Sequence, residues 1–313
     1  MRICMFRKFI YKILIFVLPV VLIGGIIVFN LSIDNNYLYE YKKKIELLEM
    51  TPQPRIIFIG GSNLAFGIDS RTIQDSLNFN VVNFGLHGGF GIKFPFEHYM
   101  HYAQKGDKVV LQFEYENFYS GGNGEQALLE LMICTNWEYV DVLNINQALI
   151  LINQIPLEVH HYILSFFYRE KQSHVTESPI YLIENSEFNE FGDEIAHFHY
   201  TSGECDIQQI ENKEDKRKIN QKFIKWLDKI INRCEQKGVD VIMLPPVCVQ
   251  SHYNNVYSND ISMILQKTRH PYIVEPSYMM LDDSCYFNSG YHVNRSGVIQ
   301  NTEHIIKVLR EHL

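Results

Sequence analysis

The sequence predicts an α/β protein: a three-layer α/β/α sandwich in which helices cover both faces of a mostly parallel sheet. Three observations support this fold. Short apolar strands recur along the 313-residue chain, helical stretches lie between them, and glycine-containing turns follow the first two strands. Apolar strands that alternate with helices are typical of parallel sheets that are buried on both faces.

Each element follows from its residue pattern. Five segments have the apolar strand pattern: RIIFIGGS from Arg55, NVVNFGLHGG at 80–89, KVVLQFEYE at 108–116, GVDVIMLPP at 238–246 and PYIVEP at 271–276. Four stretches have helical character: 67–77, 92–104, the amphipathic 212–236 and 295–312. Residues 121–205 break the alternation with an apolar helical stretch and an acidic loop, so we interpret them as an insertion that serves as a lid or a partner surface.

The composition excludes several classes of function. The net charge is −8 and no long basic block is present, which argues against nucleic-acid binding. No phosphate-binding P-loop and no dinucleotide-binding G-x-G-x-x-G occur, so no cofactor is expected. The six cysteines form no CxxC pair, and the histidine pairs His98–His101 and His197–His199 lack a third ligand at suitable spacing. We therefore expect no metal site, and we assign no disulfide.

An uncharged apolar run at 13–33 predicts one transmembrane helix, because about 20 apolar residues cross a bilayer core. Basic residues within the segment 1–12 predict a cytoplasmic N-terminus. The rest of the chain is then extracytoplasmic, with a short helix or stalk at 34–53 and one domain at 54–313. A cleaved signal peptide is the competing interpretation, but no small-x-small cleavage site follows the run.

Ser62 is the candidate nucleophile. It follows the first strand in the turn Gly60-Gly61-Ser62-Asn63. In a parallel sheet such turns lie at the edge where ligands bind, and backbone N–H groups at the start of the next helix can hold a developing oxyanion. The alternative is that Ser62 only caps that helix.

Two further residues are candidates for the oxyanion hole. Gly85 follows the second strand, where the absence of a side chain lets the backbone approach a ligand, and a plain turn is the equally good alternative. Asn117 follows the third strand and offers a side-chain donor, although it can equally cap the next turn.

His292 is the candidate general base. It lies just before the last predicted helix, on a loop at the same sheet edge as Ser62. Asn288 precedes it by one short loop and can orient the imidazole by a hydrogen bond, but it cannot stabilise an imidazolium by charge.

The order of these motifs resembles the SGNH/GDSL hydrolase superfamily, whose fold is flavodoxin-like. The resemblance covers roughly residues 54–120 and 238–313. It implies that Ser62 is the nucleophile, His292 its base, and Gly85 and Asn117 the oxyanion donors. Two departures from the family pattern stand out: the G-x-N-D context of the oxyanion asparagine is missing, and Asn288 stands where the family has an aspartate. Asp282 and Asp283 lie upstream as substitutes.

The variant with one N-terminal membrane helix resembles extracytoplasmic proteins that modify surface polysaccharides beside membrane-bound O-acyltransferases. The resemblance implies an esterase or O-acyltransferase that acts on acyl esters, acetyl above all, of cell-surface polysaccharide. Expected partners are the acylated glycan or acyl donor, the cell membrane and a membrane-bound O-acyltransferase. The alternative is a catalytically degenerate domain that binds glycan or serves as a scaffold in a cell-envelope assembly complex.

Overall fold

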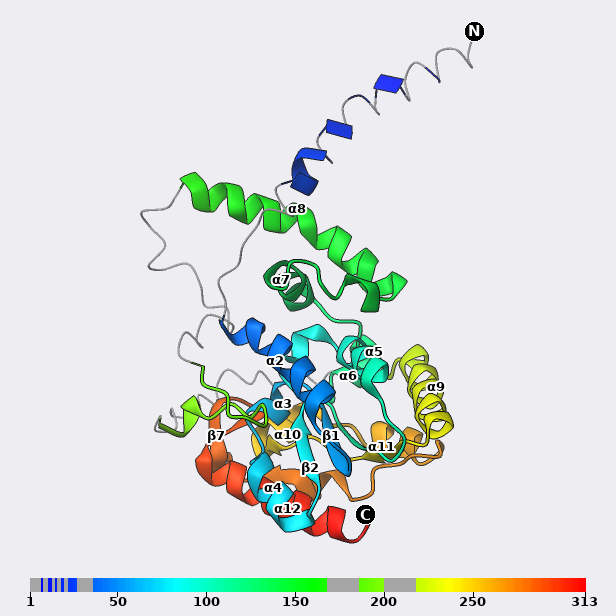
Figure 1. Cartoon of the computed structure of the whole chain (residues 1–313), viewed down its shortest axis with the longest axis vertical. Helices are drawn as coiled ribbons and strands as arrows, with labels where there is room; N and C mark the ends of the chain where they lie inside the picture. The colour runs from blue at the N-terminus through cyan, green and yellow to red at the C-terminus, as the bar shows by residue number, and fades with distance from the viewer. Residues whose placement is uncertain are drawn as a thin grey trace.

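The centre of the molecule is a four-stranded parallel sheet with the strand order β2-β1-β3-β4. The structure is a computed structural model that describes residues 36–167, 186–199 and 218–313, with scattered residues between 7 and 26. The strands are β1 (Arg55–Gly60), β2 (Asn80–Asn83), β3 (Lys108–Gln112) and β4 (Asp240–Met243). The chain is therefore an α/β protein, and four of the five predicted strands form this sheet (Figure 1).

Buried β-branched and aromatic side chains explain why these segments become central strands. All six residues of β1 are buried, and β1 pairs with β2 on one side and with β3 on the other. Ile57 and Ile59 belong to the apolar cluster on one face of the sheet, whereas Ile56 and Phe58 belong to the cluster on the opposite face. Alternate residues of a strand point to opposite faces, so both faces must be covered.

Helices cover both faces. One apolar cluster includes residues of α2 (Asn36–Met50), α5 (Lys93–Tyr102), α7 (Gln126–Cys134) and α9 (Gln221–Lys237). The cluster on the opposite face includes residues of α4 (Ser70–Leu77) and α12 (Arg295–Arg310). The predicted helices at 67–77, 92–104 and 295–312 thus correspond to α4, α5 and α12. Of the segment 212–236, the described part begins at 218, and α9 starts at Gln221.

Side-chain caps set where several of these helices begin and end. Asp69 accepts a hydrogen bond from the backbone of Thr72 at the start of α4, and Asn294 accepts one from Gly297 at the start of α12. Asn220 caps α9 in the same way, and Gly238 ends it in the left-handed conformation with φ 72°. Such caps satisfy backbone groups that a helix end leaves without partners.

The segment 271–276 is not a strand of the sheet. Only Tyr272 forms an isolated parallel bridge, to Met243 at the end of β4. Proline explains the short pairing: Pro271 has no N–H to donate, and Pro276 begins a 3-10 helix. The expected fifth strand is therefore reduced to a single pairing.

The C-terminal part of the chain instead contains two small two-stranded sheets. One joins β5 (Cys248–Val249) to β6 (Met280–Leu281), and the other joins β7 (Tyr286–Ser289) to β8 (His292–Val293). Two short helices, α10 (Gln250–Val256) and α11 (Asn259–Leu265), lie between β5 and β6 in the chain. The β7–β8 hairpin presents His292 just before α12.

Residues 34–53 contain the expected helix, but this helix packs against the sheet domain. Tyr37, Tyr41 and Leu48 of α2 are buried and belong to the same apolar cluster as β1. The Tyr41 hydroxyl also lies 3.1 Å from the Nδ1 atom of His98 in α5. Residues 36–50 are therefore part of the core of the domain.

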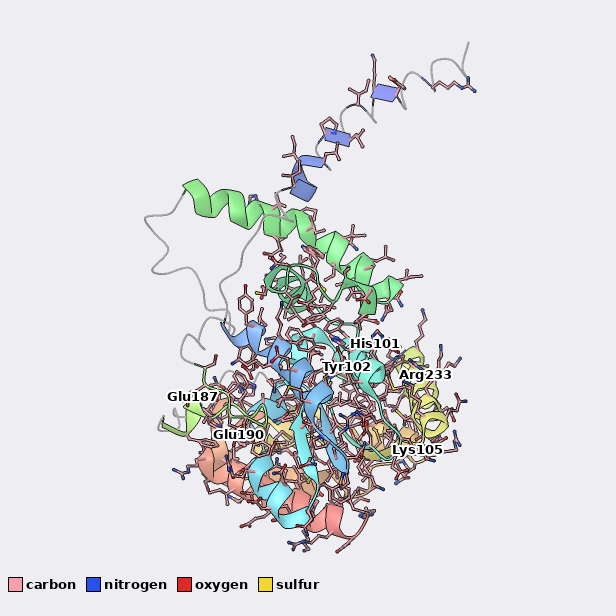
Figure 2. All side chains as sticks on the ribbon, in the orientation of Figure 1. His101, Tyr102, Lys105, Glu187, Glu190 and Arg233 are labelled. Carbon is pink, nitrogen blue, oxygen red and sulfur yellow. The ribbon has the colours of Figure 1, made fainter. Side chains whose placement is uncertain are left out.

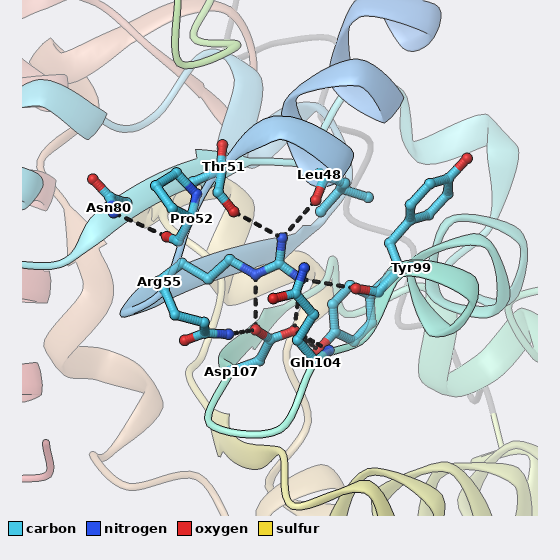
Figure 3. A network of polar contacts seen from close by, with 10 residues as sticks. Leu48, Thr51, Pro52, Arg55, Asn80, Tyr99, Gln104 and Asp107 are labelled. Atoms are coloured by element: carbon cyan, nitrogen blue, oxygen red, sulfur yellow. Dashed lines mark hydrogen bonds and ion pairs between the residues drawn. The ribbon is translucent and has the colours of Figure 1, made fainter.

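A buried ion pair fixes the C-terminal end of α2 to the sheet (Figure 3). Arg55 and Asp107 are both fully buried, with 2.7 Å between Nε and Oδ1 and 3.0 Å between Nη2 and Oδ2. The Arg55 guanidinium also donates to the carbonyls of Leu48, Thr51 and Tyr102. This network lies at the edge of the sheet where the strands begin.

The insertion contains the long helix α8 (Ile145–Phe167), which lies above α7 in Figure 1. Its other described part, residues 186–199, covers the edge of β2: the Asn83 backbone N–H donates to the carbonyl of Phe191 at 3.0 Å. Glu190 lies at the outer side of this segment (Figure 2) and pairs with Arg71 of α4. An unpaired strand edge is a site for unwanted pairing, so this segment protects the sheet.

Most of the predicted transmembrane run at 13–33 lies outside the described residues. Among the residues that are described, none belongs to a helix with the length and apolar character needed to cross a bilayer. Four of the six cysteines are described, Cys134, Cys234, Cys248 and Cys285, and all four are buried.

Candidate functional site

The first βα turn places Ser62 at the carboxyl edge of the sheet. β1 ends at Gly60, and Ser62 begins the short helix α3 (Ser62–Ala65). The turn is tight because Asn63 spans it: its Oδ1 accepts from the Gly61 N–H at 3.0 Å and its Nδ2 donates to the Gln112 carbonyl at 2.9 Å. The hydroxyl of Ser62 is thereby held at a fixed place beside the end of β3.

A pocket of about 560 Å³ opens at this edge. This volume is in the range of small-molecule sites. Both Ser62, from the first predicted motif, and His292, from the last, line this pocket. Its wall is formed by Ser62, His87, Gly88, Gly89, Gly91, Glu114, Glu116, Asn117, Ser120, Gly122, Asn123, Gly124, Glu125, Ile150, Asn288, Ser289, Tyr291 and His292. Ile150 comes from α8, so the insertion contributes to the wall. No lysine or arginine of the described residues lines it.

The hydroxyl of Ser62 contacts a carboxyl group. Ser62 Oγ donates a hydrogen bond to Oε1 of Glu114 at 3.3 Å. The backbone N–H groups of Ser62 and Asn63 also donate to the Glu114 carboxyl. The N–H groups expected to hold an oxyanion are thus directed at a side chain of the protein itself.

Glu114 fits at this place because two neighbouring residues have no side chain. A Cβ atom on Gly61 would lie 2.7 Å from Oε1 of Glu114, and one on Gly88 would lie closer still to Oε2. Burial raises the pKa of Glu114 to about 7, with a further contribution from the negative charge of Glu116. The hydrogen bonds from Ser62 and Asn63 act in the opposite direction. Near neutral pH this carboxyl is therefore divided between its two protonation states.

Glu116 belongs to a second set of polar contacts beside Glu114. The Tyr291 hydroxyl donates to Oε2 of Glu116 at 2.6 Å and accepts from the Tyr115 backbone N–H at 3.0 Å. The Nε2 atom of His252 lies 3.8 Å from Oε1 of Glu116. These contacts fix Glu116, and its charge disfavours ionisation of Glu114.

His292 faces the same pocket from the β7–β8 hairpin. Its Nδ1 lies 2.7 Å from Oδ1 of Asn288, and its ring stacks on Phe66 with the ring centroids 4.2 Å apart. Burial lowers the pKa of His292 to about 3, and His87, His197 and His252 contribute in the same direction. The imidazole is therefore neutral at physiological pH.

Ser62, His292 and Asn288 thus share one pocket, but Ser62 and His292 are not hydrogen-bonded to each other in the described structure. Among the described residues the Ser62 hydroxyl donates to Glu114. Asp282 and Asp283, the expected substitutes for the acid, point elsewhere: Asp282 caps its own turn through Ser284, and Asp283 binds Ser251.

The two candidate oxyanion donors differ in their placement. The N–H of Gly85 donates to Oδ1 of Asn83 at 3.1 Å, and Gly85 is not among the residues that line the pocket. Its role is close packing, because an added Cβ would meet Leu64 at 2.5 Å. Asn117 lines the pocket at the start of helix α6 (Asn117–Ser120), and its Nδ2 donates to the Glu114 carbonyl at 3.1 Å.

One described histidine of each of the two pairs has a structural partner. His98 contacts Tyr41, and the Nδ1 atom of His197 lies 2.5 Å from Oε2 of Glu194. Within the described ranges no group of three histidine, cysteine or acidic side chains is arranged to hold a metal ion.

Among the pocket residues that the sequence predictions missed are Glu114, Glu116 and His87. The signal was present in the sequence, because two glutamates at the end of a buried strand fall at the edge where ligands bind. His87 follows the second strand directly before Gly88 and Gly89 and faces the pocket with a pKa that burial lowers to about 4.

Comparisons with known proteins give no relatives for this chain: no family model, no curated protein and no solved structure matches it. The candidate function consequently depends on the geometry of the pocket and on the order of the sequence motifs.

Proposed function

We propose that this chain is a serine-dependent esterase or O-acyltransferase of the SGNH type, anchored in the cell membrane by residues 13–33. Its substrates are acyl esters, acetyl above all, of cell-surface polysaccharide. One observation carries the proposal: Ser62 and His292, which are far apart in the sequence, line the same pocket at the carboxyl edge of a parallel sheet.

The reaction begins with attack of Ser62 Oγ on the acyl carbonyl carbon. The N–H groups of Ser62 and Asn63 are the donors nearest to the developing oxyanion. His292 is the proton acceptor that the motif order favours, and Asn288 holds its ring through Nδ1. Water or a sugar hydroxyl then takes the acyl group from the serine ester.

Polar side chains in the wall of the pocket support a carbohydrate substrate. Asn117, Ser120, Asn123 and Asn288 contribute amide and hydroxyl groups to this wall. These groups both donate and accept hydrogen bonds, as the hydroxyl groups of a sugar require. Ile150 adds an apolar surface from α8.

The test is Ser62→Ala in the full-length protein. We expect the variant to lose turnover of p-nitrophenyl acetate and to lose covalent labelling by a fluorophosphonate, because both reactions need the hydroxyl. Hydrolysis and transfer are then separated by offering an acetylated donor together with an oligosaccharide acceptor and identifying the product. Unchanged turnover and labelling in Ser62→Ala would refute serine catalysis.

A second candidate function is a binding or scaffold domain without catalysis. Two observations favour it: the Glu114 carboxyl occupies the N–H groups beside Ser62, and Asn288 stands in place of an acidic partner for His292. This hypothesis predicts saturable binding of an acetylated oligosaccharide, measured by calorimetry, with no release of acetate and no effect of Ser62→Ala on the affinity.

A further inference from the structure

The hydrogen bond of Ser62 goes to a carboxyl group, and this contact determines where its proton can go. Oγ of Ser62 and Oε1 of Glu114 are 3.3 Å apart. A general base must lie within hydrogen-bond reach of the proton that it removes, and contacts of this kind are often long before the substrate is bound. Glu114 meets this requirement in the structure.

His292 meets it less well. The contact of Nδ1 with Asn288 leaves Nε2 as the proton acceptor, but the ring is stacked on Phe66 and no hydrogen bond links His292 to Ser62 among the described residues. Its lowered pKa, about 3, also makes the imidazole a weak proton acceptor at neutral pH. Glu114, with a pKa of about 7, is better matched to the proton transfer.

The surroundings of Glu114 are arranged for this contact. Gly61, which precedes Ser62, and Gly88, in the turn after β2, leave the space that the Glu114 carboxyl fills. Titratable groups surround it from several elements: Glu116 from the start of α6, Tyr37 from α2, His87 from the β2 turn, and Tyr291 and His292 from the C-terminal hairpin. None of these groups is a lysine or an arginine that would lock Glu114 in the ionised form.

We propose that Glu114 is the catalytic acid–base group of the Ser62 reaction and that it, not His292, takes the serine proton. This inference rests on the proposed function. As Oγ attacks the acyl carbon, the O–C bond forms, the carbonyl electron pair moves to oxygen and the proton passes to Oε1 of Glu114. Collapse of the intermediate breaks the bond to the leaving oxygen, which takes that proton from Glu114.

The same proton transfer removes an electrostatic conflict. In its ionised form Glu114 holds the N–H groups of Ser62 and Asn63, and its charge would repel an oxyanion at that place. Once protonated, the carboxyl is neutral and binds those N–H groups less strongly, so they are available to the oxyanion. In the second half-reaction, water or a sugar hydroxyl gives its proton to Glu114 as it attacks the serine ester. Collapse of that intermediate breaks the bond between Oγ and the acyl carbon, and Glu114 returns the proton to Oγ of Ser62.

The experiment compares Glu114→Gln, His292→Gln and Ser62→Ala in the full-length protein with p-nitrophenyl acetate as the probe. We expect Glu114→Gln to lower kcat by about 10²–10⁴-fold, the usual contribution of a general base. We expect His292→Gln to lower it by less than about tenfold. Glu130→Gln is the matched control, because Glu130 is also a partly buried glutamate with a raised pKa but lies outside the pocket.

The pH profile separates a proton acceptor from a residue that only maintains the fold. Wild-type kcat/KM should rise with pH to a plateau, with a midpoint near the pKa of Glu114, about 7. Glu114→Asp should keep this rise at reduced activity, whereas Glu114→Gln should lose it. Circular dichroism of each variant shows whether the fold is intact.

Two failures are distinguishable. Full activity in Ser62→Ala would refute the proposed function and the role of Glu114 together. If Ser62→Ala is inactive while Glu114→Gln keeps wild-type kcat and His292→Gln loses it, serine catalysis stands and His292 is the base, so the Glu114 proposal alone is wrong.

Discussion

Asp107 and Glu114 flank the same strand, β3, but Asp107 is fully buried whereas Glu114 is half-buried in the wall of the pocket. Asp107, at the amino end, binds the Arg55 guanidinium and accepts further hydrogen bonds from Tyr99 and the Gln104 backbone. Glu114, at the carboxyl end, has hydroxyl and amide donors, another glutamate beside it and no cation in the described part of the pocket. A buried carboxylate with a cationic partner and several hydrogen-bond donors serves the fold, whereas a carboxylate without a cation can exchange a proton.

The largest change in the free energy of unfolding should follow from breaking the Arg55–Asp107 network at the amino end of β3. Asp107→Asn leaves the Arg55 charge buried without its counter-ion, which should lower the free energy of unfolding by about 3–5 kcal/mol. Urea unfolding of the full-length protein, followed by circular dichroism, measures this loss. A loss below about 1 kcal/mol would mean that solvent reaches Arg55 and that the pair behaves as an exposed one.

A smaller effect on stability, one that depends on pH, is expected from Glu114 at the carboxyl end of β3. Because the folded-state pKa of Glu114, about 7, exceeds its ordinary value of 4.5, the folded state binds the proton more tightly. Ionisation of Glu114 should therefore reduce stability as pH rises from about 4.5 to 7, by about 2–3 kcal/mol for a group that lines a pocket. Glu114→Gln should lack this part of the decrease between pH 5 and pH 8. An identical decrease in both proteins would contradict the raised pKa.

A third substitution gives His292 a carboxylate partner, as Asp107 is the carboxylate partner of Arg55. Asn288→Asp places a carboxylate at the position 2.7 Å from Nδ1 of His292. An opposite charge at this distance should raise the pKa of His292 by about 1–3 units from its lowered value. NMR titration of the ring protons measures the shift, and Asp282→Asn, at an exposed acid that caps its own turn, is the control. A larger change in the control than in Asn288→Asp would favour the upstream acid.

The smallest effect should come from an ion pair at the surface. Arg233 of α9 lies at the outside of the molecule (Figure 2), and its guanidinium pairs with Glu97 of α5 at 2.7 Å. Arg233→Gln should lower the free energy of unfolding by less than about 1 kcal/mol, because water already solvates both charges. An effect as large as that of Asp107→Asn would remove the distinction between buried and exposed pairs.

The strands of the sheet were predictable because their signal is local. Arg55–Gly60 and Lys108–Gln112 are short apolar runs next to turn residues, and both became central strands. The segment 271–276 has the same apolar composition, but its flanking prolines restrict it to one bridge. Likewise, α2 was expected as a helix, whereas its burial against the sheet depends on partners such as His98 that lie far away in the sequence.

The site was predictable only in part, for a related reason. The positions of Ser62 and His292 follow from the rule that ligands bind at the carboxyl edge of a parallel sheet, and both line the pocket. The partner of the Ser62 hydroxyl does not follow from that rule. It depends on how far the Glu114 side chain reaches between Gly61 and Gly88, which is a matter of tertiary packing.

That packing has a consequence for how the sequence can vary. Gly61, Gly88 and Glu114 share one small volume, so a methyl group at either glycine requires a shorter side chain at position 114. In a library that randomises these three positions together, folded clones with alanine at 61 or 88 should therefore carry aspartate, serine or a smaller residue at 114. Positions 61, 88 and 114 lie in three separate stretches of the chain, and substitutions at them should occur together.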